Sequence, residues 1–328
     1  MLLRYYVFAV FFAFVQNVNA RAGASELRLV FPVACELGKT CWIQQYTDHD
    51  SGPGTTDYTC GTATYDGHDG TDIRVRTTKD TALVHAAAPG IVKSLRDGVP
   101  DQLMKTDADR AAVAKMECGN GVVVSHADGW ETQYCHMKNG SITVANGEQV
   151  EPGALLGSVG YSGAAAFPHL HFTVRKDGKT VDPFSSGPTT NCEADDQSLW
   201  AGAGTAALRY DPTTILQLGL TDRRLDLPEL EAGALPAPAL QSRSPALVAY
   251  AWMINLEKGD TVTITLSGPQ GTLAKKTETV ARHKAQYLLF AGKKKPESGW
   301  TAGKYVARVS VRGTNRDKTS SAAVFQIK

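Results

Sequence analysis

Two histidines, His169 and His171, stand one residue apart in the apolar run Pro168-His169-Leu170-His171-Phe172, which is typical of a β-strand. Side chains at positions i and i+2 of a strand lie on the same face of a sheet, so the two imidazoles are expected to project side by side. Imidazole is a common zinc ligand, and it also titrates near neutral pH. The run therefore predicts a metal site or an acid–base site, provided that other segments supply the remaining groups.

Three further residues are candidates for those groups. His68 and Asp72 are separated by three residues in a turn-rich segment, and His136 ends a predicted strand. A catalytic zinc ion needs three protein ligands and one open position. A His/Asp/His set supplies three ligands and leaves two histidines for proton transfer or for stabilising a developing oxyanion. Each spacing alone arises often by chance, so the combination within one domain carries the prediction.

The elements that must position these residues are short strands. Asp128-Gly129 and Asp177-Gly178 separate β-rich runs, which is a strong hairpin signal. Residues 96–116 are polar and alanine-rich and are interpreted as an inserted loop or short helix. We predict a mainly β fold, with an antiparallel sheet in the first domain and a small β-sandwich in the second.

The length of 328 residues suggests two domains. The predicted organisation is a signal peptide at 1–20, a catalytic domain at 21–190, a connector at 191–242 with one strand near 215–220, and a β-sandwich at 243–328. With 34 basic and 33 acidic residues, the chain lacks the basic excess of a protein that binds nucleic acid electrostatically. Ser162 lacks a Gly-x-Ser-x-Gly elbow, and there is no His-Glu-x-x-His, which argues against a serine hydrolase and a helical zincin.

The first twenty residues resemble an export signal. Arg4 precedes an apolar stretch at 5–15, and Val18-Asn19-Ala20 places small residues at a cleavage site after Ala20. The alternative is an uncleaved anchor, but the apolar stretch is short for a membrane span. No later segment is apolar enough to span a membrane, so the mature chain is expected to be exported to the periplasm or secreted.

Six cysteines in an exported chain indicate disulfides. Connectivity does not follow from sequence, since six cysteines allow fifteen pairings. The favoured pairs are Cys35–Cys41, Cys118–Cys135 and Cys60–Cys192. The second pair has a difficulty, because a hairpin turning at Asp128-Gly129 would set Cys135 opposite Val122. A bulge or bend at residues 119–121 would then have to bring Cys118 within range.

Residues 60–185, a little over a third of the chain, resemble the lysostaphin-type, or LytM-like, zinc metalloendopeptidases of bacterial peptidoglycan. The matching motifs occur in the family's order and include Gly67-His68-Asp69-Gly70-Thr71-Asp72, Ala88-Pro89-Gly90, Gly119-Asn120-Gly121, Tyr134-Cys135-His136, the turn-rich stretch 147–157, and Pro168-His169-Leu170-His171-Phe172.

The resemblance implies a duplicated-hybrid-motif type of antiparallel sheet for the first domain. The spacing of the short strands after residue 247 separately predicts a small, Ig-like sandwich. It makes His68, Asp72 and His171 the ligands of one Zn²⁺ ion, and His136 and His169 the catalytic pair. Metal-activated water would attack the peptide bond, and the sequence does not divide the proton-transfer roles between the two histidines. Peptidoglycan stem peptides are the implied substrate, cut at a D-alanyl–diaminopimelate bond or in a glycine-rich bridge.

Other functions stay open. A non-catalytic cell-wall-binding regulator, similar to an amidase activator, would use the same groove, although the complete set of five residues argues against it. A disulfide-stapled adhesion module would leave that set as coincidence. The C-terminal domain would bind wall polymer, position the catalytic domain or cover the groove, and its residues do not choose among these roles.

Overall fold

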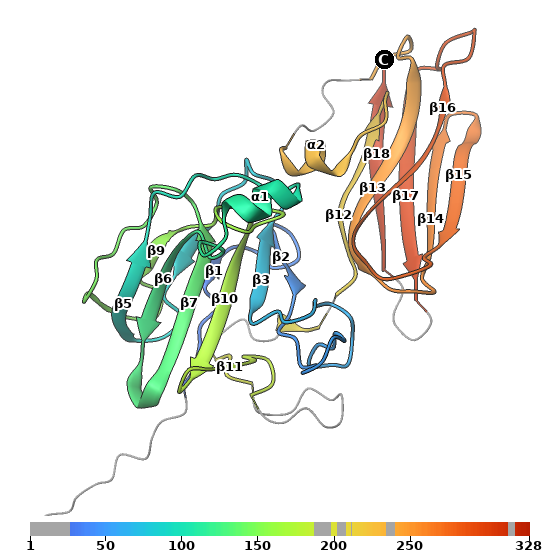
Figure 1. Ribbon diagram of the computed structural model, residues 1–328. Coiled ribbons are helices and arrows are strands. Elements are labelled where there is room, and N and C mark those ends of the chain that lie inside the picture. The colour runs from blue at the N-terminus through green and yellow to red at the C-terminus, as the bar shows by residue number, and fades with distance from the viewer. Residues whose placement is uncertain (1–26, 187–197, 202–207, 211, 234–239, 314–318) are drawn as a thin grey trace, which may run out of the picture.

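The computed structural model describes residues 27–186, 198–201, 208–210, 212–233, 240–313 and 319–328. Two β-rich domains lie side by side, joined by a segment that carries a short helix (Figure 1). The expectation of a mainly antiparallel β protein is confirmed. The predicted signal peptide lies outside the described residues. Among the described residues, no helix has the length and apolar character needed to cross a membrane.

The first domain is built on a sheet of eight strands in the order β2-β3-β10-β7-β6-β5-β8, with β11 paired to β10. Strand β10 lies between β3 and β7, so its side chains can meet those of both neighbours. The strands are β2 (Cys41–Gln45), β3 (Thr71–Val75), β5 (Gly90–Arg96), β6 (Asn120–Ser125), β7 (Trp130–Met137), β8 (Gln149–Val150), β10 (His169–Lys176) and β11 (Lys179–Val181).

A smaller sheet completes the core of this domain, with strands β1 (Val33–Ala34), β4 (Leu83–His85) and β9 (Leu155–Ser158). Successive side chains of β10 point to opposite faces of the sheet. Leu170 and Phe172 are fully buried in the core. His169 and His171 therefore lie on the opposite face of the sheet, as the sequence predicts.

The predicted hairpins at both Asp-Gly pairs are present. Asp177 and Gly178 have φ values of 50° and 79° and connect β10 to β11, as expected of a two-residue turn with left-handed backbone. The β6–β7 connection is longer, because the short 3₁₀ turn η1 (Ala127–Gly129) is closed by a hydrogen bond from the His126 amide to the Trp130 carbonyl.

This longer turn corrects the predicted register. Val122 pairs with Tyr134, not with Cys135. Two residues further along β6, Asn120 pairs with Met137, so β7 carries one extra residue in a bulge that contains Cys135 and His136. The bulge supplies the irregularity that the Cys118–Cys135 disulfide was expected to need.

Two predicted disulfides are present, Cys35–Cys41 and Cys118–Cys135, and the Cα atoms of the second pair are 4.8 Å apart. Cys60 is also disulfide-bonded. Its predicted partner, Cys192, lies outside the described residues. No described cysteine is a free thiol.

The insertion at residues 96–116 contains helix α1 (Asp107–Ala112), which begins with a capping box between Thr106 and Asp109. The insertion is attached to the loop before β10, since the Met104 amide donates to the Ala165 carbonyl at 2.8 Å. It therefore forms one border of the region around β10 (Figure 1).

The C-terminal domain is a sandwich of two antiparallel sheets, ordered β12-β13-β16 and β15-β14-β17-β18. Strand β12 comes from the segment expected to be a connector, and it pairs with β13 along its length. The elements are β12 (Thr214–Thr221), α2 (Leu227–Glu231), β13 (Ala246–Leu256), β14 (Thr261–Gly268), β15 (Gly271–Thr279), β16 (Lys284–Lys294), β17 (Gly303–Arg312) and β18 (Thr319–Ile327).

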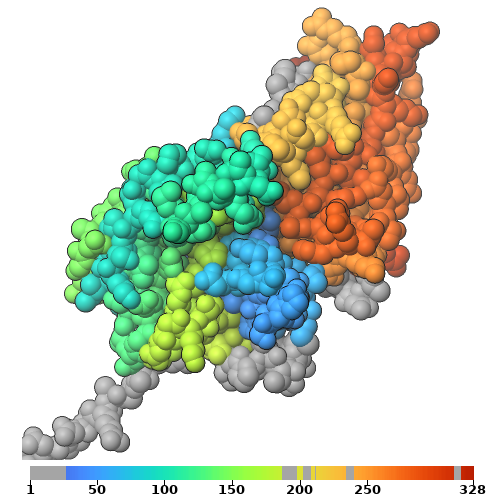
Figure 2. Space-filling model, viewed as in Figure 1, coloured from blue at the N-terminus to red at the C-terminus, as the bar shows by residue number. Residues whose placement is uncertain are grey.

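The two domains share a buried apolar cluster. Trp42 of β2 packs in it with Leu230 of α2 and Trp252 of β13, along with Leu216, Leu225, Tyr250 and Ile254. Figure 2 shows the surfaces of the two domains in direct contact, with the segment around α2 against both. The sandwich is therefore docked on the β2–β3 side of the first domain.

Candidate metal centre and catalytic site

The structure brings three of the predicted site residues to one point. The Nε2 atom of His68, Oδ1 of Asp72 and Nδ1 of His171 are the three meeting atoms. His68 Nε2 lies 3.1 Å from Asp72 Oδ1 and 3.2 Å from His171 Nδ1, and the Asp72–His171 distance is 2.9 Å. Asp72 and His171 are direct partners across β3 and β10, which places them together.

The other nitrogen of each imidazole already has a partner. His68 Nδ1 donates to the Tyr46 carbonyl at 2.6 Å. His171 Nε2 lies 3.2 Å from Asp69 Oδ1 and 3.0 Å from Thr173 Oγ1, and the carboxylate can only accept. When both rings are neutral, the two lone pairs and the Asp72 carboxylate therefore face one another. Three acceptors at this distance require a cation or a proton between them.

The spacing of the three atoms suits zinc. Zn–N and Zn–O bonds of about 2.0–2.2 Å at tetrahedral angles separate ligand atoms by roughly 3.3 Å. The observed separations of 2.9–3.2 Å are slightly smaller and require only a small expansion. His68 and Asp72 are 2 % exposed, which keeps their positions well defined.

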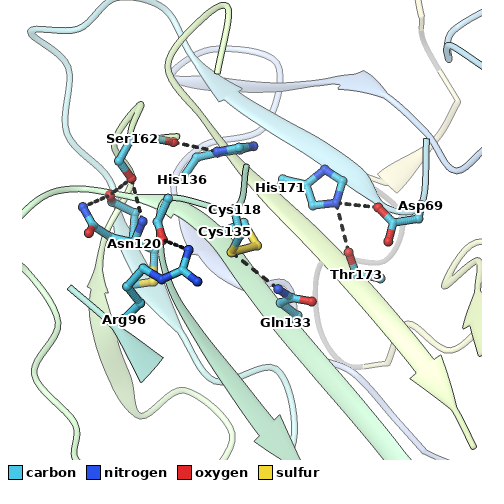
Figure 3. Close-up of a disulfide and its surroundings, with 12 residues drawn as sticks. Asp69, Arg96, Cys118, Asn120, Gln133, Cys135, His136, Ser162, His171 and Thr173 are labelled. Atoms are coloured by element: carbon cyan, nitrogen blue, oxygen red, sulfur yellow. Dashed lines mark hydrogen bonds and ion pairs between the residues drawn. A yellow bond between two sulfur atoms is a disulfide. The ribbon is translucent and has the colours of Figure 1, made fainter. Parts of the chain in front are cut away.

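Asp69 and Thr173 are neighbours of the candidate metal centre that the sequence interpretation did not single out (Figure 3). Both contact the side of His171 that faces away from Asp72, and Asp69 is itself paired with Arg175 at 3.0 Å. The position of Thr173, two residues after His171 on the same strand face, is a signal that could have identified it. Asp69 follows His68 directly, but no periodic pattern in the sequence indicates that its side chain contacts His171.

The charges at the centre are strongly coupled. Burial opposes the protonation of His171, but the hydrogen bonds to Asp69 and Asp72 outweigh burial and raise its pKa to about 9. Burial likewise opposes the ionisation of Asp72, yet His68, His169 and the hydrogen bond with His171 hold its pKa well below its usual range. In the metal-free centre at neutral pH, Asp72 is therefore ionised and His171 carries a proton.

The other two predicted histidines lie beside this centre. The rings of His136 and His169 are 4.6 Å apart between centroids. His136 Nδ1 donates to the Ser162 carbonyl at 2.8 Å, and His169 Nδ1 donates to the Phe167 carbonyl at 2.7 Å. Their Nε2 atoms are consequently left as acceptors. Burial lowers the pKa of both rings, that of His136 well below its usual value, so both are neutral at pH 7.

The backbone at His136 explains how this side chain reaches the site. His136 has a φ of 61°, which is uncommon for a residue other than glycine. It occupies the β7 bulge, and its amide donates to the Cys118 carbonyl at 2.8 Å. Figure 3 shows the Cys118–Cys135 disulfide next to His136, with Ser162 on the other side of the ring. The disulfide and the bulge together orient His136 toward β10.

Tyr65 also belongs to this region and was not predicted. Its ring centroid is 4.4 Å from that of His68, and its residue is 47 % exposed. Burial of the hydroxyl and the nearby Asp72 and Asp69 raise its pKa, so the phenol stays protonated. By contrast, both ring nitrogens of His126 form hydrogen bonds, to the Pro89 carbonyl and to Thr132.

The first domain is thus an antiparallel β-domain in which two histidines and an aspartate converge on one point that could hold a metal ion, with two further histidines beside them. Residues 66–183 match peptidase family M23, and the chain carries a domain of this family. The resemblance found in the sequence motifs is thus confirmed at the level of the family.

The chain is similar to two kinds of curated relatives over this domain. It is 36% identical over 106 residues to the DD-carboxypeptidase/endopeptidase Mpg of Neisseria meningitidis, which covers 30% of this chain and 24% of that protein. It is 42% identical over 71 residues to the cell division protein DipM of Caulobacter vibrioides, covering 20% and 11%. The match therefore spans about a quarter or less of the length of these relatives.

Among solved structures, the catalytic domain of the prophage-encoded M23 protein EnpA from Enterococcus faecalis is similar at 24% identity. The alignment covers 44% of this chain and 92% of that chain, with a TM-score of 0.31.

Proposed function

We propose that the chain is an exported, zinc-dependent endopeptidase that hydrolyses peptide cross-links of bacterial peptidoglycan. One observation carries the proposal: the candidate ligand atoms of His68, Asp72 and His171 lie within 3.2 Å of one another while the outer nitrogens of both imidazoles are already hydrogen-bonded. This donor set fits Zn²⁺, and the match of residues 66–183 to peptidase family M23 supports peptide-bond hydrolysis.

His68, Asp72 and His171 would hold the metal, which when bound supplies Lewis acidity toward the peptide carbonyl and an acidified water. The residues around it would move the protons. His136 and His169 are neutral and carry their hydrogen on Nδ1, so the Nε2 atom of either ring can accept a proton from the attacking water. A ring that has gained a proton can then donate it to the leaving amine.

The hydrogen bonds from Nδ1 of His136 and His169 to backbone carbonyls determine which nitrogen of each ring can transfer the proton. Because Ser162 and Phe167 offer carbonyl oxygens, Nδ1 must carry the hydrogen in both rings, and proton transfer is confined to Nε2. The ring of His169 lies nearer the metal ligands, with Nε2 3.4 Å from Asp72 Oδ1. Asp72 would stabilise the positive charge that His169 acquires.

The test is a pair of variants that separates metal binding from proton transfer. His171→Ala should lose both zinc and hydrolysis of purified sacculi. His169→Ala should keep zinc and lose activity by roughly 10²- to 10⁴-fold, the usual contribution of a general acid or base. His283→Ala, a histidine of the C-terminal domain, serves as the control and should change neither property. Full hydrolysis by both site variants would refute the proposal.

Zinc stoichiometry distinguishes the enzyme from its rival. A wild-type protein with zinc content near zero and no hydrolysis, but with affinity for sacculi, would instead be a non-catalytic wall-binding regulator. Mass spectrometry of fragments from sacculi of both types identifies the bond, with D-alanyl–diaminopimelate and glycine-bridge products as the two expected classes. The predicted signal peptide and the disulfides support export.

A further inference from the structure

Arg74 is a fully buried arginine at the boundary between the two domains. It lies on β3, two residues after Asp72, and its side chain has no exposed surface. Its guanidinium carbon is 4.9 Å from the centroid of the Phe167 ring and 5.0 Å from that of Trp252. One aromatic ring therefore comes from the catalytic domain and the other from the sandwich, with the cation between them.

The charge of Arg74 is neutralised by Glu231 at the end of α2. Arg74 Nη2 lies 3.0 Å from both carboxylate oxygens of Glu231, which is 3 % exposed, and Nη1 donates to Gln44 Oε1 at 2.6 Å. An unpaired buried charge is strongly unfavourable. Removing one member of such a pair therefore destabilises the packing of the residues around the charge that remains. Arg74 can consequently stay buried and paired only while α2 and the sandwich are packed against the first domain.

The same arginine is adjacent to the segment that holds His169. Arg74 and His169 are direct partners across β3 and β10, and the Val75 amide donates to the Pro168 carbonyl at 3.1 Å. The Phe167 ring, which packs on Arg74, is also 4.4 Å from the His169 ring. The Phe167 carbonyl is the acceptor that fixes His169 Nδ1. Contacts thus run without a gap from Glu231 through Arg74 and Phe167 to His169.

We infer that α2 and the C-terminal sandwich position His169 for catalysis, with Glu231, Arg74 and Trp252 as positioning residues that act through Phe167. This role is distinct from the three that the sequence left open for the domain, which are binding wall polymer, positioning the catalytic domain and covering the groove. The inference rests on the proposed function for its turnover measurements, but the orientation of His169 can be measured without any substrate.

The test compares two neutralising substitutions on the same helix. Glu231→Gln leaves Arg74 without its counter-charge. Glu229→Gln makes the identical chemical change two residues away, at a half-buried position that pairs with Arg223 and where glutamine also satisfies the capping box. Both variants are examined as full-length, zinc-loaded protein. The readouts are zinc content, kcat, KM and the NMR signal of the His169 Nδ1–H, identified by its absence in His169→Ala.

Glu231→Gln is expected to keep its zinc and its KM within about twofold and to lose kcat by about tenfold or more, because a small displacement of a catalytic group has effects of this size. The His169 Nδ1–H signal should shift or exchange faster. Glu229→Gln should match the wild type in all four readouts. An unchanged kcat and an unchanged His169 signal in folded Glu231→Gln would overturn the inference, and so would a loss of activity explained by loss of zinc.

If Glu231→Gln does not fold, Trp252→Leu decides the question, since it removes the aromatic contact and leaves the ion pair intact. A lower kcat with an altered His169 signal supports positioning, whereas wild-type values for both refute it. The two proposals fail separately. If zinc-loaded wild type has no peptidase activity, the proposed function is wrong, while the His169 signal still shows whether Glu231 and Trp252 control its orientation.

Discussion

Zinc binding by the His68–Asp72–His171 centre is expected to displace a proton from His171, and Asp69→Asn should reduce that release. Metal-free His171 has a pKa of about 9, and the hydrogen bond to Asp69 is the first of the interactions that raise it against the effect of burial. Asp69 stays ionised at neutral pH, since its hydrogen bond from His171 lowers its own pKa to about 2. The proton on His171 and the metal therefore compete for the same side chain.

The sign of the pH dependence follows from this competition. Zinc requires the neutral ring, so a raised pKa weakens zinc binding below pH 9, and affinity rises as the pH increases toward that value. With a pKa of about 9, the proton weakens binding at pH 7 by a factor of about 100. An imidazole with the ordinary pKa of 6.5 would weaken it by a factor of about 1.3.

Calorimetry measures the protons released. Zinc is titrated into metal-free protein at pH 8 in two buffers of different ionisation enthalpy, and affinity is measured by chelator competition between pH 7 and 9. Asp69→Asn should release fewer protons at pH 8 and should reach its pH-independent affinity at a lower pH than the wild type. Asp66→Asn removes the same charge at an exposed position nearby and should behave as the wild type does.

Equal proton release by the wild type and Asp69→Asn would refute the role assigned to Asp69. A zinc affinity that does not change between pH 7 and 9 would refute the coupling between His171 and the carboxylates. Protons lost from metal-bound water are common to all three proteins, so the difference between variants isolates the contribution of His171.

Two further predictions concern the support of His136. Replacing both Cys118 and Cys135 by alanine opens a loop with a sequence separation of 17 and should lower the free energy of unfolding by about 3 kcal/mol in urea denaturation, an effect that an unchanged midpoint would disprove. Gly121→Ala would place a Cβ atom 2.5 Å from the Tyr134 carbonyl oxygen and 2.9 Å from Cys118 Sγ, so it should destabilise the protein by about 1–3 kcal/mol in the same assay. If Gly121→Ala is as stable as the wild type, the β7 bulge can shift to accept the Cβ atom and the prediction is wrong.

Much of the site could be predicted because it depends on local pattern. Strand alternation placed His169 and His171 together on the face opposite Leu170 and Phe172, and that placement holds. The Asp177-Gly178 turn needed only two residues that tolerate positive φ. The β6–β7 register was wrong by one residue, because η1 lengthens the turn and hydrogen bonding between His126 and Trp130 is not visible in a dipeptide motif.

The sequence by itself identified the candidate site residues, since its histidine and aspartate motifs occur in the order of the family that it resembles. Tertiary structure decided how each group is used. Which nitrogen of His68 and His169 is free depends on the Tyr46 and Phe167 carbonyls, and the left-handed backbone at His136 depends on the bulge opposite Gly121. Arg74 occupies a strand that alternates charged and apolar residues from Asp72 to Val75, yet it is fully buried because Glu231 and Trp252, distant in sequence, pack against it. A charged side chain can be buried only when its partners are present, and those partners are brought to it by the folding of the other domain.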